Sequence, residues 1–331
     1  MEFLQITWFY IIVILFAGYA ILDGYDLGVG ILTPFIAKND AEKRALFNTI
    51  GPVWDGNEVW LITAGASLFA AFPPVYATVF SGFYLPLMLV LLGLIFRAVS
   101  LEFWSYDPAN RKLWSVALVM GSFLPSLLYG VALGNVILGI PLNGADDFSG
   151  TFFTLLRPFP LVAGLVGLLA IMLHGAAFTV HKTAGGMRKR AVGLTGTIWW
   201  GFLLAYLVMV VMGAISLEGA VSQWMGWLFA VLVLVALFLI RWFLKKGDDF
   251  KVFLSSSLIH VNLWGLIAAI HFPRLVKVSN DPGVGMTIYN SSSGPLTLKV
   301  MTLIAVVGMP VVIGYSIYVH RVFRGKVNPG D

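Results

Sequence analysis

The chain has 331 residues, of which 59% are hydrophobic and 11% are charged, and its mean hydropathy is +0.89. Soluble domains carry about 25% charged residues, so this composition excludes an ordinary soluble protein and indicates one that is solvated mainly by lipid. Cysteine is absent, which excludes disulfides, iron–sulfur ligation and thiolate ligation of haem. The net charge of +5 is explained below by membrane topology and gives no reason to expect a nucleic-acid partner.

The hydropathy along the chain predicts an all-α protein that crosses the membrane nine times, because a span needs about 20 mainly apolar residues. The amino-terminal segment MEFLQITWFY has no basic region and no small-residue cleavage site, so we expect a retained first helix and no removed signal peptide. We expect one transmembrane domain over residues 1–331. The predicted spans are residues 7–36, 57–71, 74–100, 113–139, 160–182, 190–216, 223–245, 250–273 and 297–323.

The first span contains two carboxyl groups in the sequence ILDGYDLGVG, residues 21–30. Asp23 and Asp26 are three residues apart and therefore share a helix face. An ionised Asp at the centre of a membrane helix costs about 3 kcal/mol on insertion scales, so such residues usually have a function. Gly24 and Gly28 allow another helix to approach closely. The two acids either belong to a packing face, where they are protonated or satisfied by polar neighbours, or they form part of a proton relay or a water-filled cavity.

The second span starts with GPVWDGNEVW, residues 51–60, and ends at Pro73-Pro74, where a helix loses backbone hydrogen bonds. Asp55 and Glu58 have the spacing of a capping box at the start of this helix. Asn57 adds a polar side chain that a simple cap does not need. The alternative to a cap is therefore a polar group at the membrane surface that takes up protons.

Arg97 ends the long apolar stretch LPLMLVLLGLIFRAV of the third span. A long basic side chain in this position usually extends to the membrane surface. The alternative is an ion pair with Asp55 or Glu58, which are expected at the same depth.

The five histidines of the chain are the residues through which a membrane redox protein would be expected to bind haem. His320 lies in a basic segment and is expected to be solvated. His174 and His260 lie deeper in their spans, and each of them alone is more often a hydrogen-bonded core residue than a ligand. We expect no cofactor-binding or metal-binding residue in this chain. A cytochrome subunit that holds its own haem between two histidines is the alternative.

The Lys and Arg residues predict the orientation of the chain. Of the 21 basic residues, all but four fall on one side of the nine spans, which therefore faces the cytoplasm. The amino terminus is then outside and the carboxyl terminus inside. The two longest outer segments, residues 140–159 and 274–296, are rich in Gly, Ser, Asn and Pro and are expected to be loops. The four outer basic residues are Arg157, Arg274, Lys277 and Lys299.

Several stretches of the chain resemble subunit II of the cytochrome bd-type quinol oxidases. The resemblance lies in LDGYDLGVGILTPF, in the long block that runs from NTIGPVWDGNEVWLITAG to IFRAVSLEF, and in TIYNSSSGPLTLKVMTLIAVVGMPVVIGYSIYVHRVF near the end. It implies two four-helix bundles and a peripheral helix, in agreement with nine spans. It also implies a multi-pass protein of the cytoplasmic membrane of a bacterium or archaeon.

The resemblance further implies a heterodimer with a subunit I that binds quinol and carries b-type and d-type haems, or only b-type haems. That complex oxidises quinol and reduces dioxygen to water. In the family, the Asp of the WDGN motif, here Asp55, is implicated in proton uptake from the cytoplasm. Asp55, Glu58, Asp23, Asp26 and Arg97 are therefore the expected proton pathway or its support. A small single-helix subunit, lipids and quinone are further possible partners.

A proton-coupled secondary transporter is the alternative from another functional class, since it also places acids within the membrane. A transporter of that kind has broken helices at corresponding positions of two halves. The sequence shows one such break, at Pro73-Pro74, and we see no internal repeat.

Overall fold

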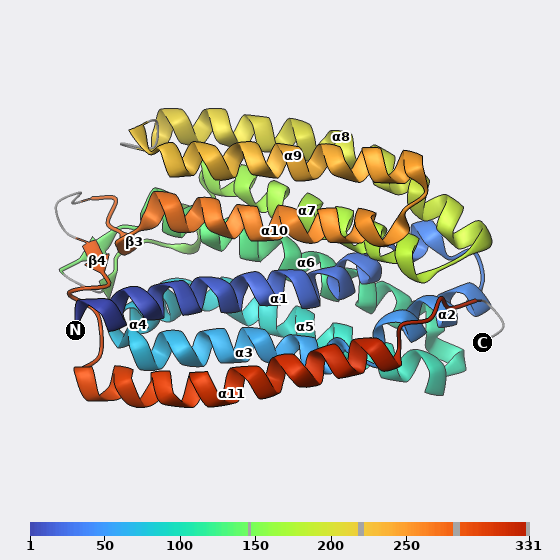
Figure 1. Ribbon diagram of the computed structural model, residues 1–331, viewed down its shortest axis with the longest axis horizontal. Helices are drawn as coiled ribbons and strands as arrows, with labels where there is room; N and C mark the ends of the chain where they lie inside the picture. The colour runs from blue at the N-terminus through green and yellow to red at the C-terminus, as the bar shows by residue number, and fades with distance from the viewer. Residues whose placement is uncertain (145–146, 218–221, 281–284, 329–331) are drawn as a thin grey trace.

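A computed structural model describes residues 1–144, 147–217, 222–280 and 285–328 of the chain. Long helices lie side by side along the longest axis of the molecule (Figure 1). This arrangement confirms the expected all-α membrane fold. The helices are α1 (Glu2–Ile36), α2 (Asp40–Ile50), α3 (Trp54–Ala71), α4 (Pro73–Gly82), α5 (Tyr84–Tyr106), α6 (Arg111–Leu138), α7 (Pro158–Lys182), α8 (Gly185–Ser216), α9 (Trp224–Lys246), α10 (Asp249–His271) and α11 (Pro295–Val322), with short 3₁₀ turns at Pro108–Asn110 and Phe152–Leu155.

Eight helices of the described part are long and apolar enough to cross a membrane, namely α1 and α5 to α11. Seven of them, α1 and α6 to α11, match a predicted span to within about six residues at either end, and α5 starts ten residues after the beginning of its predicted span. The predicted span 57–71 forms α3, an 18-residue helix that packs against α1 and α11 but is not one of the eight. The count of nine spans and the division into two four-helix bundles stay predictions.

The predicted third span, residues 74–100, is wrong as a single helix. The structure divides it at Phe83 into the short helix α4 and the longer helix α5. Pro86 explains the division, because it has no backbone N–H to donate to the preceding turn. In the first turn of a new helix that missing N–H removes no hydrogen bond, so α5 starts two residues before Pro86.

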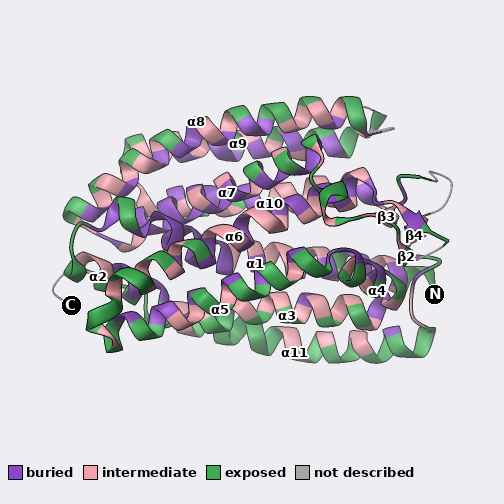
Figure 2. Cartoon of the chain, turned by 180° about the vertical axis from the view of Figure 1, so that it is seen from behind, coloured by how far each residue is buried: buried purple, intermediate pink, exposed green. Residues whose placement is uncertain are grey.

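Helices α1 and α7 form the centre of the molecule, where buried residues are most frequent (Figure 2). Their backbones touch at two glycines. A Cβ atom built on Gly28 would lie 2.3 Å from the carbonyl oxygen of Ile171 and 2.8 Å from the Cα of Gly175. Gly24 packs less tightly, with its nearest neighbour, the His174 ring, at 3.7 Å. The sequence predicted a close helix approach at Gly24 and Gly28, and Gly28 is the one that provides it.

Helix α11 is the most exposed long helix of the described chain, with Leu298 as its one buried residue. At its outer end, Trp8 donates from Nε1 to the Leu298 carbonyl at 3.2 Å and to Thr302 Oγ1 at 3.1 Å. Beyond its inner end, Lys326 pairs with Asp249 at 2.9 Å. Polar contacts therefore hold α11 at both ends, as expected for a peripheral helix.

The outer segments contain more regular structure than the predicted loops. Strands β1 (Leu142–Asn143) and β2 (Asp147–Phe148) form one antiparallel pair, and β3 (Arg274–Lys277) and β4 (Gly285–Thr287) form another. These segments satisfy backbone groups outside the helices, which composition alone did not indicate.

Helix α2 was also not predicted, and it packs under the inner end of α1. Arg190 of α8 donates to the Ile36 carbonyl at 2.5 Å and to Glu42 Oε2 at 2.6 Å. The Lys38 N–H donates to Glu42 at 2.8 Å. Partial burial acts to raise the pKa of Glu42, but these hydrogen bonds and the nearby positive charges outweigh it, so the pKa lies below its ordinary value.

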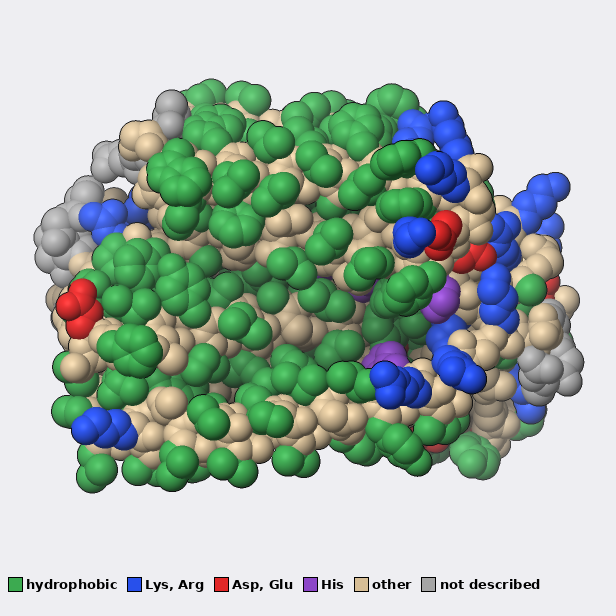
Figure 3. All heavy atoms as spheres, in the orientation of Figure 1, with side chains coloured by type: hydrophobic (Ala, Val, Ile, Leu, Met, Phe, Trp, Pro, Cys, Tyr) green, Lys and Arg blue, Asp and Glu red, His purple; other side chains and the backbone are tan. Residues whose placement is uncertain are grey.

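The first turn of α1 and the last turn of α11 lie at opposite ends of the molecule (Figure 1). Lys and Arg side chains gather at the end where α11 finishes (Figure 3). We call this the inner end, because the distribution of basic residues assigns it to the cytoplasm.

Candidate functional site

Five polar side chains from three helices meet inside the protein near its inner end. They are Asp23 and Asp26 of α1, Asn57 and Glu58 of α3, and Arg97 of α5, and we call them the inner polar cluster. All except Glu58 are buried, and the Glu58 side chain is 21% exposed. The structure therefore brings together four of the five site residues that the sequence predicted.

Arg97 is the centre of the inner polar cluster. Its Nη1 donates to Asp23 Oδ1 at 2.5 Å, and its Nη2 donates to Glu58 Oε1. Its guanidinium carbon lies 5.8 Å from the ring centre of Trp54, within the range of a cation–π contact. The Arg97 side chain is 0% exposed, so the expected extension to the membrane surface is wrong. The alternative, an ion pair with Glu58, is confirmed.

The expected capping box of α3 is also wrong. The residue that precedes the helix is Val53, and α3 has no side-chain cap. Asp55 is the second residue of the helix and is exposed. The Glu58 carboxylate binds the guanidinium of Arg97 and does not bond back to the start of the helix, because a charge-assisted hydrogen bond is about twice as strong as a neutral one.

Asp26 is bound by a chain of hydrogen bonds from uncharged polar side chains. Asn57 donates from Nδ2 to Asp26 Oδ2 and to Tyr25 Oη, both at 2.8 Å. Tyr25 Oη in turn lies 3.0 Å from Nε2 of His320. The expectation that His320 is simply solvated is therefore wrong. Tyr25 stands in the same motif as the two acids, but His320 is 295 residues away and no sequence pattern connects it to them.

The inner polar cluster has more acidic groups than basic ones. It contains three carboxyl groups, those of Asp23, Asp26 and Glu58, and one guanidinium, that of Arg97, which binds Asp23 and Glu58. Asp23 Oδ2 and Asp26 Oδ1 are buried and have no hydrogen-bond partner among the described residues. Adjacent carboxylates oppose each other's ionisation, and buried polar atoms normally have partners. The cluster therefore offers two atoms at which protons or water molecules can bind.

The position of the cluster along the helices explains how the chain tolerates two acids in its first span. Asn57 is the fourth residue of α3, and His320 is the third from the end of α11. Both residues contact Tyr25, so Asp23 and Asp26 lie level with the inner ends of these helices. Residues 27–36 continue α1 beyond that level and pack against other protein segments.

The two deep histidines lie side by side, with ring centres 4.8 Å apart. His174 donates from Nε2 to the Ile21 carbonyl at 2.9 Å, and its Nδ1 lies 2.7 Å from Ser256 Oγ. His260 bonds through Nδ1 to the Ser256 carbonyl at 3.1 Å. Both nitrogens of His174 are thus engaged, so the pair does not fit two axial ligands of one haem. Among the described residues no group of three or more His, Asp or Glu is placed to hold a metal ion.

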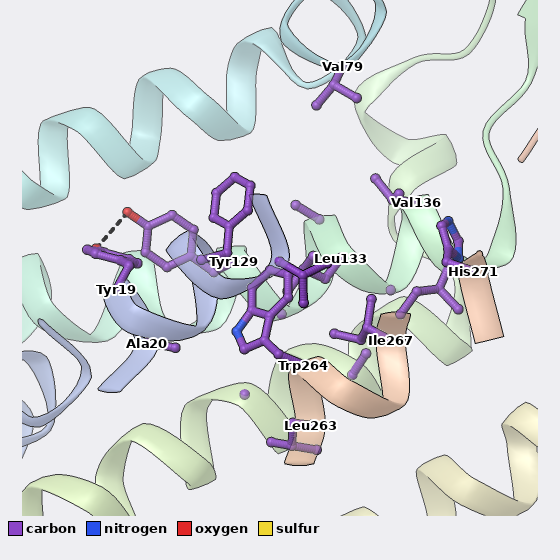
Figure 4. Close-up of a pocket in the computed structure, with 18 of the residues that line it drawn as sticks. Tyr19, Ala20, Val79, Tyr129, Leu133, Val136, Leu263, Trp264, Ile267 and His271 are labelled. Atoms are coloured by element: carbon purple, nitrogen blue, oxygen red, sulfur yellow. Dashed lines mark hydrogen bonds between the residues drawn. The ribbon is translucent and has the colours of Figure 1, made fainter. Parts of the chain in front are cut away.

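A cavity of about 980 Å³ lies between the helices on the outer side of the cluster. Its walls are mostly apolar, with Tyr19, Tyr129, Trp264 and His271 among the few polar side chains (Figure 4). The hydroxyl groups of Tyr19 and Tyr129 are 3.0 Å apart, and Tyr19 is one helical turn from Asp23. Because a buried water molecule needs two to four polar partners, these walls do not support a continuous water path.

Comparisons with known proteins place this chain in a family. The sequence profile of the family "Cytochrome bd terminal oxidase subunit II" matches residues 4–323. The chain belongs to this family. It is therefore one component of a multi-subunit terminal oxidase, an oxidoreductase, and it is a multi-pass membrane protein. The resemblance found in the sequence motifs is confirmed.

Full-length relatives of this subunit II agree with the assignment. The chain is 34% identical to cytochrome bd-I ubiquinol oxidase subunit 2 of Escherichia coli strain K12, covering 100% of this chain and 97% of the relative. It is 32% identical to cytochrome bd ubiquinol oxidase subunit 2 of Bacillus subtilis strain 168, covering 99% and 98%. A chain of the bd oxidase from Geobacillus thermodenitrificans has the same fold, with a TM-score of 0.83 at 16% identity over 98% of this chain and 99% of that one.

Proposed function

We propose that this chain is the haem-free subunit of a quinol oxidase in the cytoplasmic membrane of a prokaryote. Its partner, subunit I, would bind quinol and carry the haems at which dioxygen is reduced to water. The curated relatives support the quinol substrate, because they are subunits of ubiquinol oxidases. The arrangement of His174 and His260 supports placing the haems in the partner, since His174 has no free nitrogen.

The second part of the proposal is that the inner polar cluster takes up protons from the cytoplasm for oxygen reduction. The observation that carries it is the path from an exposed carboxylate to buried ones. Asp55 is exposed, Glu58 follows it one turn later, and Arg97 holds Glu58 and Asp23 on its two terminal nitrogens. A carboxylate at the surface attracts protons, and a partly buried one next to it can pass them inward.

In this mechanism Arg97 stays charged and positions the acids. Its planar fork holds two carboxyl groups close together, so a proton can pass from Glu58 to Asp23 without deprotonating the guanidinium. The unpaired Oδ2 of Asp23 and Oδ1 of Asp26 are the atoms proposed to accept it. The apolar cavity beyond Tyr19 limits onward movement, so the proton leaves the cluster toward the partner subunit.

We propose that the partner covers the face formed by α3 and α5, within the first three predicted spans. Large apolar side chains are exposed there, and the exposed Asp55 and partly exposed Glu58 lie on the same helices. A partner on this face connects the proton path to the haems. The apolar residues concerned are Ile62, Phe69, Leu85, Met88, Leu92, Ile95 and Phe96.

Replacing Asp55 by Asn tests the proton-uptake proposal in the assembled oxidase. Asn keeps the size and polarity of Asp but does not bind and release protons. We expect Asp55→Asn to assemble with normal haem content and to turn over more slowly, with a deficit that grows as pH rises and protons become scarce. Glu58→Gln should show the same pattern. The measurement is quinol-dependent oxygen consumption and proton uptake in proteoliposomes between pH 6 and 9, as a working range of about three units around neutrality.

Glu102→Gln is the matched control, because Glu102 is an exposed acid of α5 outside the cluster. It should turn over like the wild type at every pH. If Asp55→Asn also matches the wild type at every pH, Asp55 has no part in proton uptake.

A further inference from the structure

The inner end of α11 has one contact that membrane topology and proton uptake through Asp55 do not explain. His320 is partly buried against α1, and its Nε2 lies 3.0 Å from the hydroxyl oxygen of Tyr25. The Tyr25 side chain is itself buried and stacks on Phe178 with ring centres 4.1 Å apart. One side chain of the mostly exposed helix α11, that of His320, therefore contacts the buried Tyr25 hydroxyl, which belongs to the hydrogen-bond network around Asp26.

The hydrogen bonds of His320 determine which of its nitrogens carries the proton in the neutral ring. Nδ1 lies 2.8 Å from the Ser316 carbonyl, which can only accept, so Nδ1 carries the hydrogen. Nε2 is then an acceptor, and the Tyr25 hydroxyl donates to it. The Tyr25 oxygen keeps its lone pairs for Asn57, whose Nδ2 donates to it at 2.8 Å.

The same argument orients Asn57. Its Nδ2 has two hydrogens and faces three acceptors, namely Tyr25 Oη and Asp26 Oδ2 at 2.8 Å and the Leu22 carbonyl at 3.2 Å. The two shorter contacts take the hydrogens. If Tyr25 no longer had His320 as an acceptor, its hydroxyl would have to find another one, and Asp26 Oδ2 is an acceptor that shares the Asn57 amide with Tyr25.

We infer that His320 is a positioning residue for Asp26, and that it acts through Tyr25 and Asn57. By accepting a hydrogen bond from the Tyr25 hydroxyl, His320 directs that hydrogen away from Asn57 and leaves the lone pairs of the phenol oxygen for the Asn57 amide, which then holds the Asp26 carboxyl group. The inference rests on the proposed role of the inner polar cluster in proton uptake, and it adds α11 to the elements that support that role.

Charged residues lie on both sides of His320, with the inner polar cluster on the Tyr25 side and several Lys and Arg residues around the end of α11. Lys182 binds the carbonyl groups of Phe323 and Gly325, and Lys326 pairs with Asp249. These contacts fix the segment after α11 and therefore the position of His320 along the axis of that helix. Other charged residues of this region are Arg321 and Arg324 on the α11 side and Asp55 and Glu58 on α3, which packs against α11.

The test compares two replacements of His320 in the assembled oxidase. Phe fills a similar volume without an acceptor, whereas the side-chain oxygen of Gln can accept from Tyr25. We expect His320→Phe to slow quinol-dependent turnover by about twofold to tenfold, the range for losing one hydrogen bond, with unchanged haem content. His320→Gln should restore most of the rate. Tyr25→Phe should match His320→Phe, and the double variant should be no slower than either one.

The second readout is the position of Asn57 in a cryo-electron microscopy map of each variant. The amide should leave Asp26 in His320→Phe and keep its place in His320→Gln. Tyr318→Phe is the control on the same helix, because Tyr318 is 66% exposed. An unchanged Asn57 in His320→Phe overturns the inference. If Asp26→Asn turns over like the wild type, the proposed role of Asp26 in proton uptake is wrong. The position of Asn57 in the map of His320→Phe still tests separately whether His320 positions Asn57 and Asp26.

Discussion

At the scale of single residues, Arg97 connects three helices through two carboxylates. It lies on α5, and its partners Asp23 and Glu58 lie on α1 and α3. The free energy gained by such a buried pair is largely offset by the cost of removing the charges from water. Its main effect is therefore on geometry, since one guanidinium fixes where the two acids stand relative to each other.

We expect Arg97→Met to destabilise the protein by about 3–5 kcal/mol, because it leaves the buried Asp23 and the partly buried Glu58 without their cation. Arg97→Lys should recover only part of that loss, since an ammonium lacks the planar fork that binds two carboxylates at once. The measurement is the yield and melting temperature of the assembled, haem-containing complex.

Arg111→Met is the matched control for Arg97. Arg111 pairs with Asp40 at 2.8 Å, but their side chains are 27% and 54% exposed. A surface pair of this kind contributes about 0–1 kcal/mol, so the control should leave the melting temperature nearly unchanged. Equal losses in the two variants would contradict a special role for Arg97.

The sequence predicted most residues of the site but missed the contact between Tyr25 and His320. Acids in an apolar span and an arginine at the end of another are visible as violations of hydropathy, so Asp23, Asp26 and Arg97 were found. Tyr25 and His320 violate no pattern. A Tyr in a span and a His in a basic segment are both common, and only the folded chain shows that they meet.

At the scale of elements, the contact between α1 and α7 depends on Gly28 and Gly175, whose backbones leave no room for a side chain. We expect Gly28→Ala to destabilise the chain by about 1–3 kcal/mol, because its Cβ would lie 2.3 Å from a backbone oxygen that has no flexible side chain to move. The measurement is the melting temperature of the purified complex.

Gly196→Ala is the control for this prediction. Gly196 lies within α8, and a Cβ there has no neighbour within 4 Å. Since Ala favours a helix over Gly by about 1 kcal/mol, this variant should be neutral or more stable than the wild type. A stabilising Gly28→Ala would show that α1 and α7 separate more easily than the structure implies.

The stability of the contact between α1 and α2 should depend on pH, because Glu42 titrates there. The pKa of Glu42 is lowered on folding, so the carboxylate stabilises the folded chain above its ordinary pKa of about 4.3 and loses that effect as pH falls through the lower, folded value. The difference in melting temperature between the wild type and Glu42→Gln should therefore be largest at neutral pH and shrink in acid. A difference that grows in acid would have the wrong sign.

The sequence predicted long helices well and short elements poorly. Spans of 20 or more apolar residues have few alternatives in a membrane, so α6 to α11 were predicted almost to their ends. The break at Phe83 was missed, because Gly82 and Pro86 also occur inside membrane helices, where neighbours can satisfy the freed backbone groups. Helix α2 is short and polar, and its place depends on Arg190, which lies 148 residues from Glu42.

At the scale of the whole molecule, the chain is expected to be one half of a catalyst. Among its described residues no group of three or more His, Asp or Glu is placed to bind a metal. We expect His174→Ala and His260→Ala to leave every haem band of the assembled complex in place. The measurement is a reduced-minus-oxidised spectrum, together with a spectrum of this chain purified alone, which should show no Soret band.

Loss of one haem band in either His variant, with the two subunits still associated, would place a haem ligand in this chain. The control is the haem content of the complex per mole of protein, which separates loss of a ligand from loss of assembly.

The bond between Tyr25 and His320 also has a consequence for biosynthesis. The ribosome makes α1 first and α11 last, so the Tyr25 hydroxyl has no His320 to bind until nearly the whole chain has been translated. Up to that moment the first helix has an unfinished polar contact at the inner end, which is expected to face the cytoplasm, where chaperones and proteases act. A chain truncated before residue 320 never closes this contact, and we expect such chains to be degraded before they join the oxidase.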